Sequence, residues 1–236
     1  MEHGLSGLRS NEVRAKNAIT LIWIVMGLEV LTLGSNYMQH SLLQNIASGG
    51  EVTAGEAASN DSRVQLIAIL SLVAFVVSIV TFIQWFRRAY YNLHQSTGNL
   101  AYSEGWAAGS WFVPILNLFR PYQIMTELYS RTATLLSQKD IPLKKYMDTQ
   151  FLGFWWGLWI VNNMVGNYTF RTSMKSETID SMLTVSMVEM VGNVIMIALS
   201  LITIKVIKDY SINESLLFEL NKETEENTAT ATEGVV

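Results

Sequence analysis

The sequence contains no cysteine, and only three prolines and three histidines among its 236 residues. Without cysteine there is no disulfide framework, no thiol nucleophile and no thiolate metal site. His3, His40 and His94 lie far apart on separate segments, so we expect no metal site. The sequence also lacks a phosphate-binding glycine loop, a nucleophile elbow and a His-Glu-x-x-His motif. We therefore expect no enzyme activity, no catalytic residue and no cofactor.

Charge is the second shortage, because only 15% of the residues are charged while half are hydrophobic. The apolar residues form four runs, at about 18–38, 64–86, 149–168 and 183–204. A bilayer core about 30 Å thick needs roughly 20 apolar residues of helix. The third run reaches that length only when Thr149 and residues 167–168 are included. The pattern predicts an all-α protein built as a four-helix transmembrane bundle.

The basic residues fall almost entirely on one side of these runs. If the N-terminus is cytoplasmic, thirteen of the sixteen Lys and Arg residues lie on inner segments, and only Arg63, Arg171 and Lys175 lie outside. The positive-inside rule then predicts a multi-pass protein of the inner (cytoplasmic) membrane with both termini cytoplasmic. The expected partner is the lipid bilayer, and charges held at a membrane surface make nucleic-acid binding unexpected.

The predicted domain boundaries follow from these runs. Residues 1–17 form a cytoplasmic N-terminal arm, residues 18–208 a transmembrane domain, and residues 209–236 an acidic, partly disordered cytoplasmic tail. The outer loop 40–63 is rich in small and polar residues and is predicted to be mobile. Residues 106–136, between spans two and three, are predicted as a re-entrant or interfacial segment, because the apolar part is short and Pro114 interrupts it. A kinked fifth span reaching about Leu128 is the alternative.

Four strings in the middle of the chain are distinctive: WFRRAYYNL at 85–93, YSEGWA at 102–107, WFVPILNL at 111–118 and RPYQ at 120–123. They resemble the bacterial domain-of-unknown-function family numbered 4328, whose members are small multi-span membrane proteins. The resemblance is specific over residues 85–129 and covers roughly residues 60–210 in layout. It implies a bacterial origin and an inner-membrane location, and it implies no activity.

Two carboxylates, Glu29 and Glu189, lie inside the predicted spans, and Asn162, Asn163 and Asn193 lie at comparable depths. A charged group inside a bilayer is costly, so such residues normally face the bundle interior or water. These five residues could form one polar cluster that serves a proton, a cation or a polar substrate. The alternative is a protonated carboxyl group that is hydrogen-bonded to a neighbour and locks helix packing.

A second group of candidate residues lies at the inner boundary of span two and in the middle segment. It consists of Arg87, Arg88, Tyr90, Trp106, Trp111, Pro114, Asn117, Arg120 and Pro121. Arginine pairs well with phosphate or carboxylate, so these side chains could hold a lipid headgroup. Equally, they could pair with Glu104 or Glu127 and pin the middle segment.

Three functions are consistent with these features. The leading hypothesis is a non-enzymatic interaction or accessory subunit of a bacterial envelope complex, or a homo-oligomer. The alternative is a small ion- or proton-coupled channel or transporter that uses the intramembrane carboxylates. Lipid handling at the inner leaflet is the third. Transport is favoured if Glu29, Asn163, Glu189 and Asn193 face one interior, and a partner helix is favoured if Glu29 or Glu189 faces outward.

Overall fold

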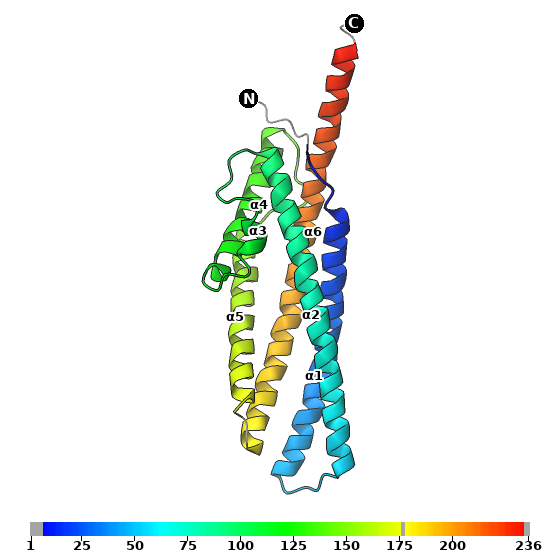
Figure 1. The fold of residues 1–236 in the computed structure, drawn as a ribbon, viewed down its shortest axis with the longest axis vertical. Helices are drawn as coiled ribbons and strands as arrows, with labels where there is room; N and C mark the ends of the chain where they lie inside the picture. The colour runs from blue at the N-terminus through cyan, green and yellow to red at the C-terminus, as the bar shows by residue number, and fades with distance from the viewer. Residues whose placement is uncertain (1–6, 176–177, 234–236) are drawn as a thin grey trace. The chain divides into compact units, whose positions relative to one another are not determined.

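The computed structural model is all-α, as predicted, and Figure 1 shows the order of its elements by colour. It describes residues 7–175 and 178–233, with side chains through Glu219. The helices are α1 (Glu12–Ala47), α2 (Ala54–Ser96), α3 (Trp106–Gly109), the 3-10 turn η1 (Leu116–Leu118), α4 (Arg120–Gln138), α5 (Thr149–Ser173) and α6 (Ile179–Glu233).

Three of these helices are long and apolar enough to cross a membrane. They are α1, α2 and the part of α6 from Ile179 to Glu219. The third predicted span, residues 149–168, falls within the 25-residue helix α5. The helix α5 is not among the three, and Asn162, Asn163 and Asn167 interrupt its apolar residues.

The long helices extend beyond the apolar runs at the predicted outer side. Only residues 48–53 lie outside helices between α1 and α2, so the prediction of a mobile loop over 40–63 is wrong for most of its length. A capping box explains the early start of α2. The backbone N–H of Thr53 donates to Glu56 Oε2 at 2.8 Å, and the backbone N–H of Glu56 donates to Thr53 Oγ1 at 3.2 Å.

The middle segment is divided into short pieces rather than forming one long helix. The helix α3 has four residues, Pro114 lies in the turns that follow it, and η1 has three residues. Pro121 then starts α4, where a missing N–H costs nothing because the first helical N–H groups have no partner within the helix. Residues 106–128 therefore do not form one continuous or singly kinked helix. Instead, α4 is amphipathic and buries one face, which includes Ile124, Met125 and Leu128.

The chain divides into two compact units that share the long helices. Unit 1 comprises Met1–Ala18, Val80–Gly153 and Lys205–Val236, and unit 2 comprises Ile19–Ile79 and Phe154–Ile204.

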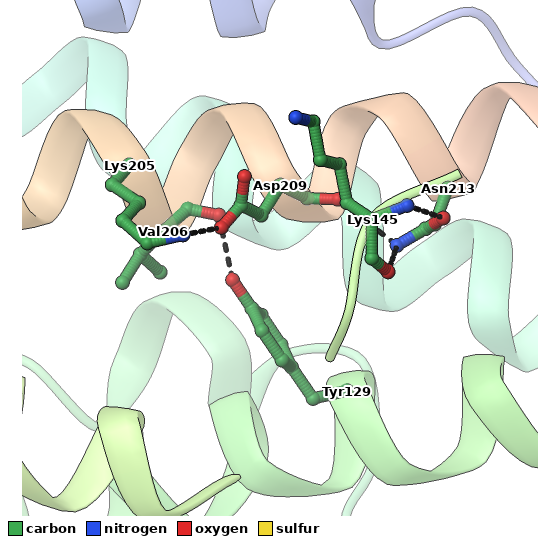
Figure 2. A network of polar contacts seen from close by, with 6 residues as sticks. All are labelled: Tyr129, Lys145, Lys205, Val206, Asp209 and Asn213. Atoms are coloured by element: carbon green, nitrogen blue, oxygen red, sulfur yellow. Dashed lines mark hydrogen bonds and ion pairs between the residues drawn. The ribbon is translucent and has the colours of Figure 1, made fainter. Parts of the chain in front are cut away.

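Unit 1 has an aromatic core. The Trp85 ring packs edge-on against the Tyr210 ring, with ring centroids 5.9 Å apart. The Tyr129 ring stacks on the Tyr210 ring at the same distance. Figure 2 shows Tyr129 of α4, and Lys145 of the segment that follows α4, beside α6. The Tyr129 hydroxyl donates to the carbonyl oxygen of Val206 at 2.7 Å, and the Asn213 side chain exchanges hydrogen bonds of 2.8 and 3.2 Å with the backbone of Lys145.

Unit 2 consists of four helical segments joined by polar contacts and close packing. His40 of α1 lies 2.7 Å from the Ser186 hydroxyl of α6, and the Trp155 ring N–H of α5 donates to Thr203 of α6 at 3.0 Å. A Cβ atom on Gly192 would lie 3.4 Å from a Val165 methyl group, at van der Waals contact, so α5 and α6 pack together at this position.

The outer faces of the long helices are apolar and exposed. On α2, Leu66 is 61% exposed, Val73 is 58% exposed and Leu70 is 50% exposed. A run of exposed large apolar side chains is costly in water and favourable against lipid chains. This surface is suited to contact with a bilayer.

Candidate functional site

A cavity of about 640 Å³ lies within unit 2, among segments of α1, α2, α5 and α6. Apolar side chains, including Ile67, Phe75 and Val165, line part of it. Polar groups from all four helices line the rest: Glu29, Thr32, Ser35, Asn36, Ser71, Asn162, Thr169, Ser173, Glu189 and Asn193. We call it the unit 2 cavity.

Helical spacing explains why so many polar residues reach one cavity. On α1 they fall at 29, 32 and 36, and on α5 at 162, 169 and 173. Intervals of three, four and seven residues place side chains on one face of a helix. The polar lining residues of α1 therefore share one face of that helix, and those of α5 share one face of theirs.

A hydrogen-bonded chain crosses the cavity from α1 to α6. The Asn193 side-chain amide donates to Glu29 Oε2 at 2.7 Å. Asn36 in turn donates to Asn193 Oδ1 at 3.0 Å, which fixes the orientation of the Asn193 amide. The Glu29 carboxylate is thus held at a defined position on the cavity wall.

The second carboxylate, Glu189, lies one helical turn before Asn193 on α6 and lines the same cavity. Among the residues that the structure describes, no donor is hydrogen-bonded to Glu189. A half-buried carboxylate without a donor is destabilised, because it has lost part of its hydration and gained nothing in exchange. Its oxygens remain available to a ligand.

Hydroxyl and amide oxygens complete the lining. Thr32 and Ser71, from α1 and α2, have their hydroxyl oxygens 3.5 Å apart. Asn162 of α5 donates only to the weak acceptor Met196 Sδ, at 3.7 Å. Carboxylate, hydroxyl and amide oxygens suit protons, alkali cations and ammonium groups. Within the described residues, no group of three or more His, Cys, Asp or Glu side chains gathers as a metal site.

The structure brings together four of the five predicted cluster residues and leaves one outside. Glu29, Asn162, Glu189 and Asn193 line the unit 2 cavity, whereas Asn163 is exposed and donates to the carbonyl oxygen of its own helix at Trp159. The prediction did not include Thr32, Ser35, Asn36, Ser71, Thr169 or Ser173. The signal that could have found Thr32 and Asn36 is their spacing of three and seven residues from Glu29.

The inner-boundary residues lie in unit 1 and mostly contact the middle segment. Arg87 forms an ion pair with Glu104 at 3.1 Å, and the Arg120 guanidinium stacks over the Tyr102 ring at 4.2 Å. Tyr90 donates to Glu127 Oε2 at 2.7 Å. Burial raises the pKa of Tyr90, and the hydrogen bond to Glu127 raises it further. This phenol therefore stays protonated.

The remaining members of that set have packing roles or lie at the surface. The Trp111 ring packs edge-on against Phe82 and Phe86. Pro121 is buried, Asn117 is partly buried, and Trp106 and Pro114 are exposed. Arg88 has no ion pair within the described part of the chain.

Unit 1 holds a buried polar cluster that the sequence did not suggest. Asn92 donates to Glu214 Oε1 at 2.7 Å, and Asn11 donates to Glu214 Oε2 at 3.1 Å. The three residues come from α2, α6 and the position just before α1. Burial raises the pKa of Glu214 to about 7, against the opposing effects of Asn92, Asn11 and Arg88.

The fold and the cavity together define a class: a helical membrane protein with several candidate membrane-spanning helices. The sequence model of one family, described as a domain of unknown function (DUF4328), matches residues 48–211. The chain belongs to this family, which confirms the resemblance seen at residues 85–129. No curated protein and no solved structure matches the chain.

Proposed function

We propose that this protein is a non-enzymatic, four-span inner-membrane protein that binds a small monovalent cation, or a proton, in the unit 2 cavity and conducts it across the bilayer. Both termini lie in the cytoplasm in this arrangement. The two carboxylates and the hydroxyl and amide oxygens in the lining support this substrate class.

The fourth span in this proposal is α5. Its 25 residues extend about 37 Å at 1.5 Å per residue, which exceeds a bilayer core of about 30 Å. Its polar residues Asn162 and Thr169 line the cavity and are partly buried. With four spans, the thirteen inner basic residues and the three outer ones satisfy the positive-inside rule.

One observation carries the proposal: Glu29 and Glu189, from two different helices, line the same cavity within otherwise apolar segments. Intramembrane carboxylates are expensive, and they mark ion or proton paths in membrane proteins. The Asn193 amide donates a hydrogen bond to Glu29 and fixes its position, whereas the Glu189 carboxylate has no such donor among the described residues. A cation entering the cavity would first neutralise Glu189.

The cavity extends along α5 to Ser173, the last residue of that helix, and along α1 from Glu29 to Asn36. Under the proposed topology these positions lie in the outer half of the membrane. The solute would therefore enter from the outside. Its passage to the inside requires a rearrangement of the helix segments on the cytoplasmic side of Glu29.

Flux into liposomes tests this function. The purified protein is reconstituted into liposomes that contain a pH-sensitive, a sodium-sensitive or a potassium-sensitive dye, and the flux of each ion is followed after its gradient is applied. Glu189→Gln and Glu29→Gln each remove one carboxyl group at nearly constant volume. Glu51→Gln makes the same chemical change in the exposed loop before α2 and serves as the control.

The proposal predicts that Glu189→Gln and Glu29→Gln abolish the flux while Glu51→Gln preserves it. Equal flux through all four proteins, or no flux of any of the three ions with the native protein, would contradict it. Circular dichroism and gel filtration of each variant separate loss of function from loss of fold.

A second candidate, an accessory or homo-oligomeric subunit, is favoured by Asn163. This amide is exposed on the outer surface of α5, next to the exposed apolar residues Val161 and Met164. A polar side chain on a lipid-facing surface often bonds to another helix. Native mass determination in a gentle detergent tests it, because Asn163→Leu should dissociate such an assembly while Met164→Leu should not.

A further inference from the structure

Unit 1 contains a second pocket, of about 320 Å³, whose chemistry is opposite to that of the unit 2 cavity. Four arginines line it: Arg9 and Arg14 from the N-terminal arm and the start of α1, and Arg87 and Arg88 from α2. Among the described residues of its lining, Glu104 is the only acidic one. We call this site the arginine pocket.

The positive charge of the arginine pocket is not balanced within the described residues. Glu104 pairs with Arg87, and Arg14 and Arg88 form no ion pair there. Glu214 attracts Arg88 from the protein interior, but its oxygens are hydrogen-bonded by Asn11 and Asn92. Burial lowers the pKa of Arg88, and the charges of Arg14 and Arg9 lower it further.

The like charges are held together by contacts that do not neutralise them. Asn92 accepts a hydrogen bond from the backbone N–H of Arg9 at 3.0 Å and donates one to its carbonyl oxygen at 2.9 Å. The guanidinium groups of Arg9 and Arg88 lie over the Tyr91 ring, at 4.8 and 5.6 Å from its centre. The fold therefore keeps the guanidinium groups close together in spite of their mutual repulsion, and a bound anion would offset that repulsion.

We propose that the arginine pocket binds a phosphate group, carried by an anionic lipid headgroup or by a soluble phosphate ester. Guanidinium groups match phosphate oxygens with two parallel hydrogen bonds, and an aromatic ring that orients two of them reduces the entropy lost on binding. Arg87 and Arg88 follow directly after the apolar run that ends at Phe86, at the level where lipid phosphates lie. Unlike the proposed function, this site involves no residue of unit 2.

Native mass spectrometry of the full-length, delipidated protein tests the proposal. The two probes are phosphatidylglycerol and a diacylglycerol with the same acyl chains, which lacks the phosphate. The main variant is the double substitution Arg14→Gln/Arg88→Gln. The control, Lys139→Gln/Lys208→Gln, removes two exposed cations of unit 1 outside the pocket.

The expected result is selective binding of phosphatidylglycerol, weakened about tenfold or more in Arg14→Gln/Arg88→Gln and unchanged in the lysine control. The variant Arg14→Lys/Arg88→Lys keeps the charge and loses the paired hydrogen bonds, so its binding should be intermediate. This variant, with the two-lipid comparison on the native protein, also decides the matter if the glutamine variant does not fold. Equal binding of the two lipids, or equal loss in the arginine and lysine variants, would overturn the proposal.

A competition arm separates the two sources of phosphate. If glycerol 3-phosphate displaces phosphatidylglycerol from the native protein, the site accepts soluble phosphate esters. If it does not, the acyl chains contribute and the site is specific for lipid.

Discussion

The two units of this chain differ in how far their large side chains are buried within the protein. Among the described residues, the largest fully buried side chains lie in unit 1, with the single exception of Trp155. Unit 2 instead leaves many of its large apolar side chains exposed, and its helices surround a cavity lined by both apolar and polar groups. Unit 1 has the packing of a water-soluble core, whereas unit 2 depends on lipid to cover its outer face. The long helices thus contribute one part of their length to the densely packed core of unit 1 and another part to the cavity of unit 2.

The largest expected effect is on the aromatic core of unit 1. Trp85→Ala removes a fully buried ring that packs on Phe82, Phe86 and Tyr210, and should cost about 3–5 kcal/mol of stability. Trp23→Ala, in unit 2, removes a ring that is 44% exposed and should cost about 1 kcal/mol or less. Thermal unfolding in detergent measures both, and similar losses would erase the contrast between the units.

The second effect is a pH dependence of the stability of unit 1. Glu214 ionises at its ordinary pKa of 4.5 when exposed and at about 7 when buried in the fold. Between these values the folded chain binds more protons than the unfolded chain, so stability is highest below about pH 5 and falls as the pH rises through 7. The expected loss is on the order of 3 kcal/mol. Arg88 and Tyr210 are the ionisable groups that interact with Glu214.

Glu214→Gln should remove most of this dependence, because the amide cannot ionise. Glu219→Gln changes an exposed carboxyl on the same helix and should retain it. Unfolding temperatures at pH 5 and pH 8 compare the three proteins. If the native protein unfolds at the same temperature at both pH values, the Glu214 carboxyl is not buried as described.

A smaller effect is expected for the hydrogen-bonded chain in unit 2. Asn193→Ala removes the donor to Glu29 and the acceptor for Asn36, and should cost about 1 kcal/mol, as for other polar contacts between membrane helices. Ion flux should nevertheless fall strongly, because Glu29 loses its fixed position. If Asn193→Ala instead costs as much stability as Trp85→Ala and leaves the flux normal, these hydrogen bonds serve only to hold α1 and α6 together.

The smallest effect is expected at the surface of unit 1. Lys144→Gln breaks an ion pair with Glu219 of 3.3 Å in which both side chains are at least half exposed. Such pairs contribute about 0–1 kcal/mol, and salt should reduce the difference further. A larger loss would show that unit 1 depends on its surface charges as well as on its core.

The sequence was sufficient to predict the all-α fold and the carboxylates that line the cavity. Long apolar runs predict helices, and Glu29 and Glu189 are conspicuous because nothing else inside those runs is charged. The extent of the helices was harder to predict, because α1 and α2 continue through polar residues that apolar runs do not mark. The capping box at Thr53 and Glu56 was a local signal of that extension.

The sequence could not reveal the contacts that join distant segments. Glu214 lies in an acidic tail and reads as a surface residue, yet Asn11 and Asn92 meet it from positions 203 and 122 residues away. Asn36 is one of several polar residues near the end of α1, and only the position of Asn193 gives it a role. Such pairings depend on how the helices pack, which hydropathy and spacing do not determine.

Access of water to the unit 2 cavity is the most direct test of the central claim, and the absence of native cysteine makes it simple. Ser71→Cys places a thiol in the cavity, and Leu70→Cys places one on the lipid-facing side of the same helix at nearly the same depth. Thiols react as thiolates, which require water. A membrane-impermeant maleimide added to the outside of intact cells should label the protein with Ser71→Cys and leave the protein with Leu70→Cys unlabelled. Equal labelling of the two proteins, or labelling of Leu70→Cys alone, would contradict a water-accessible polar cavity.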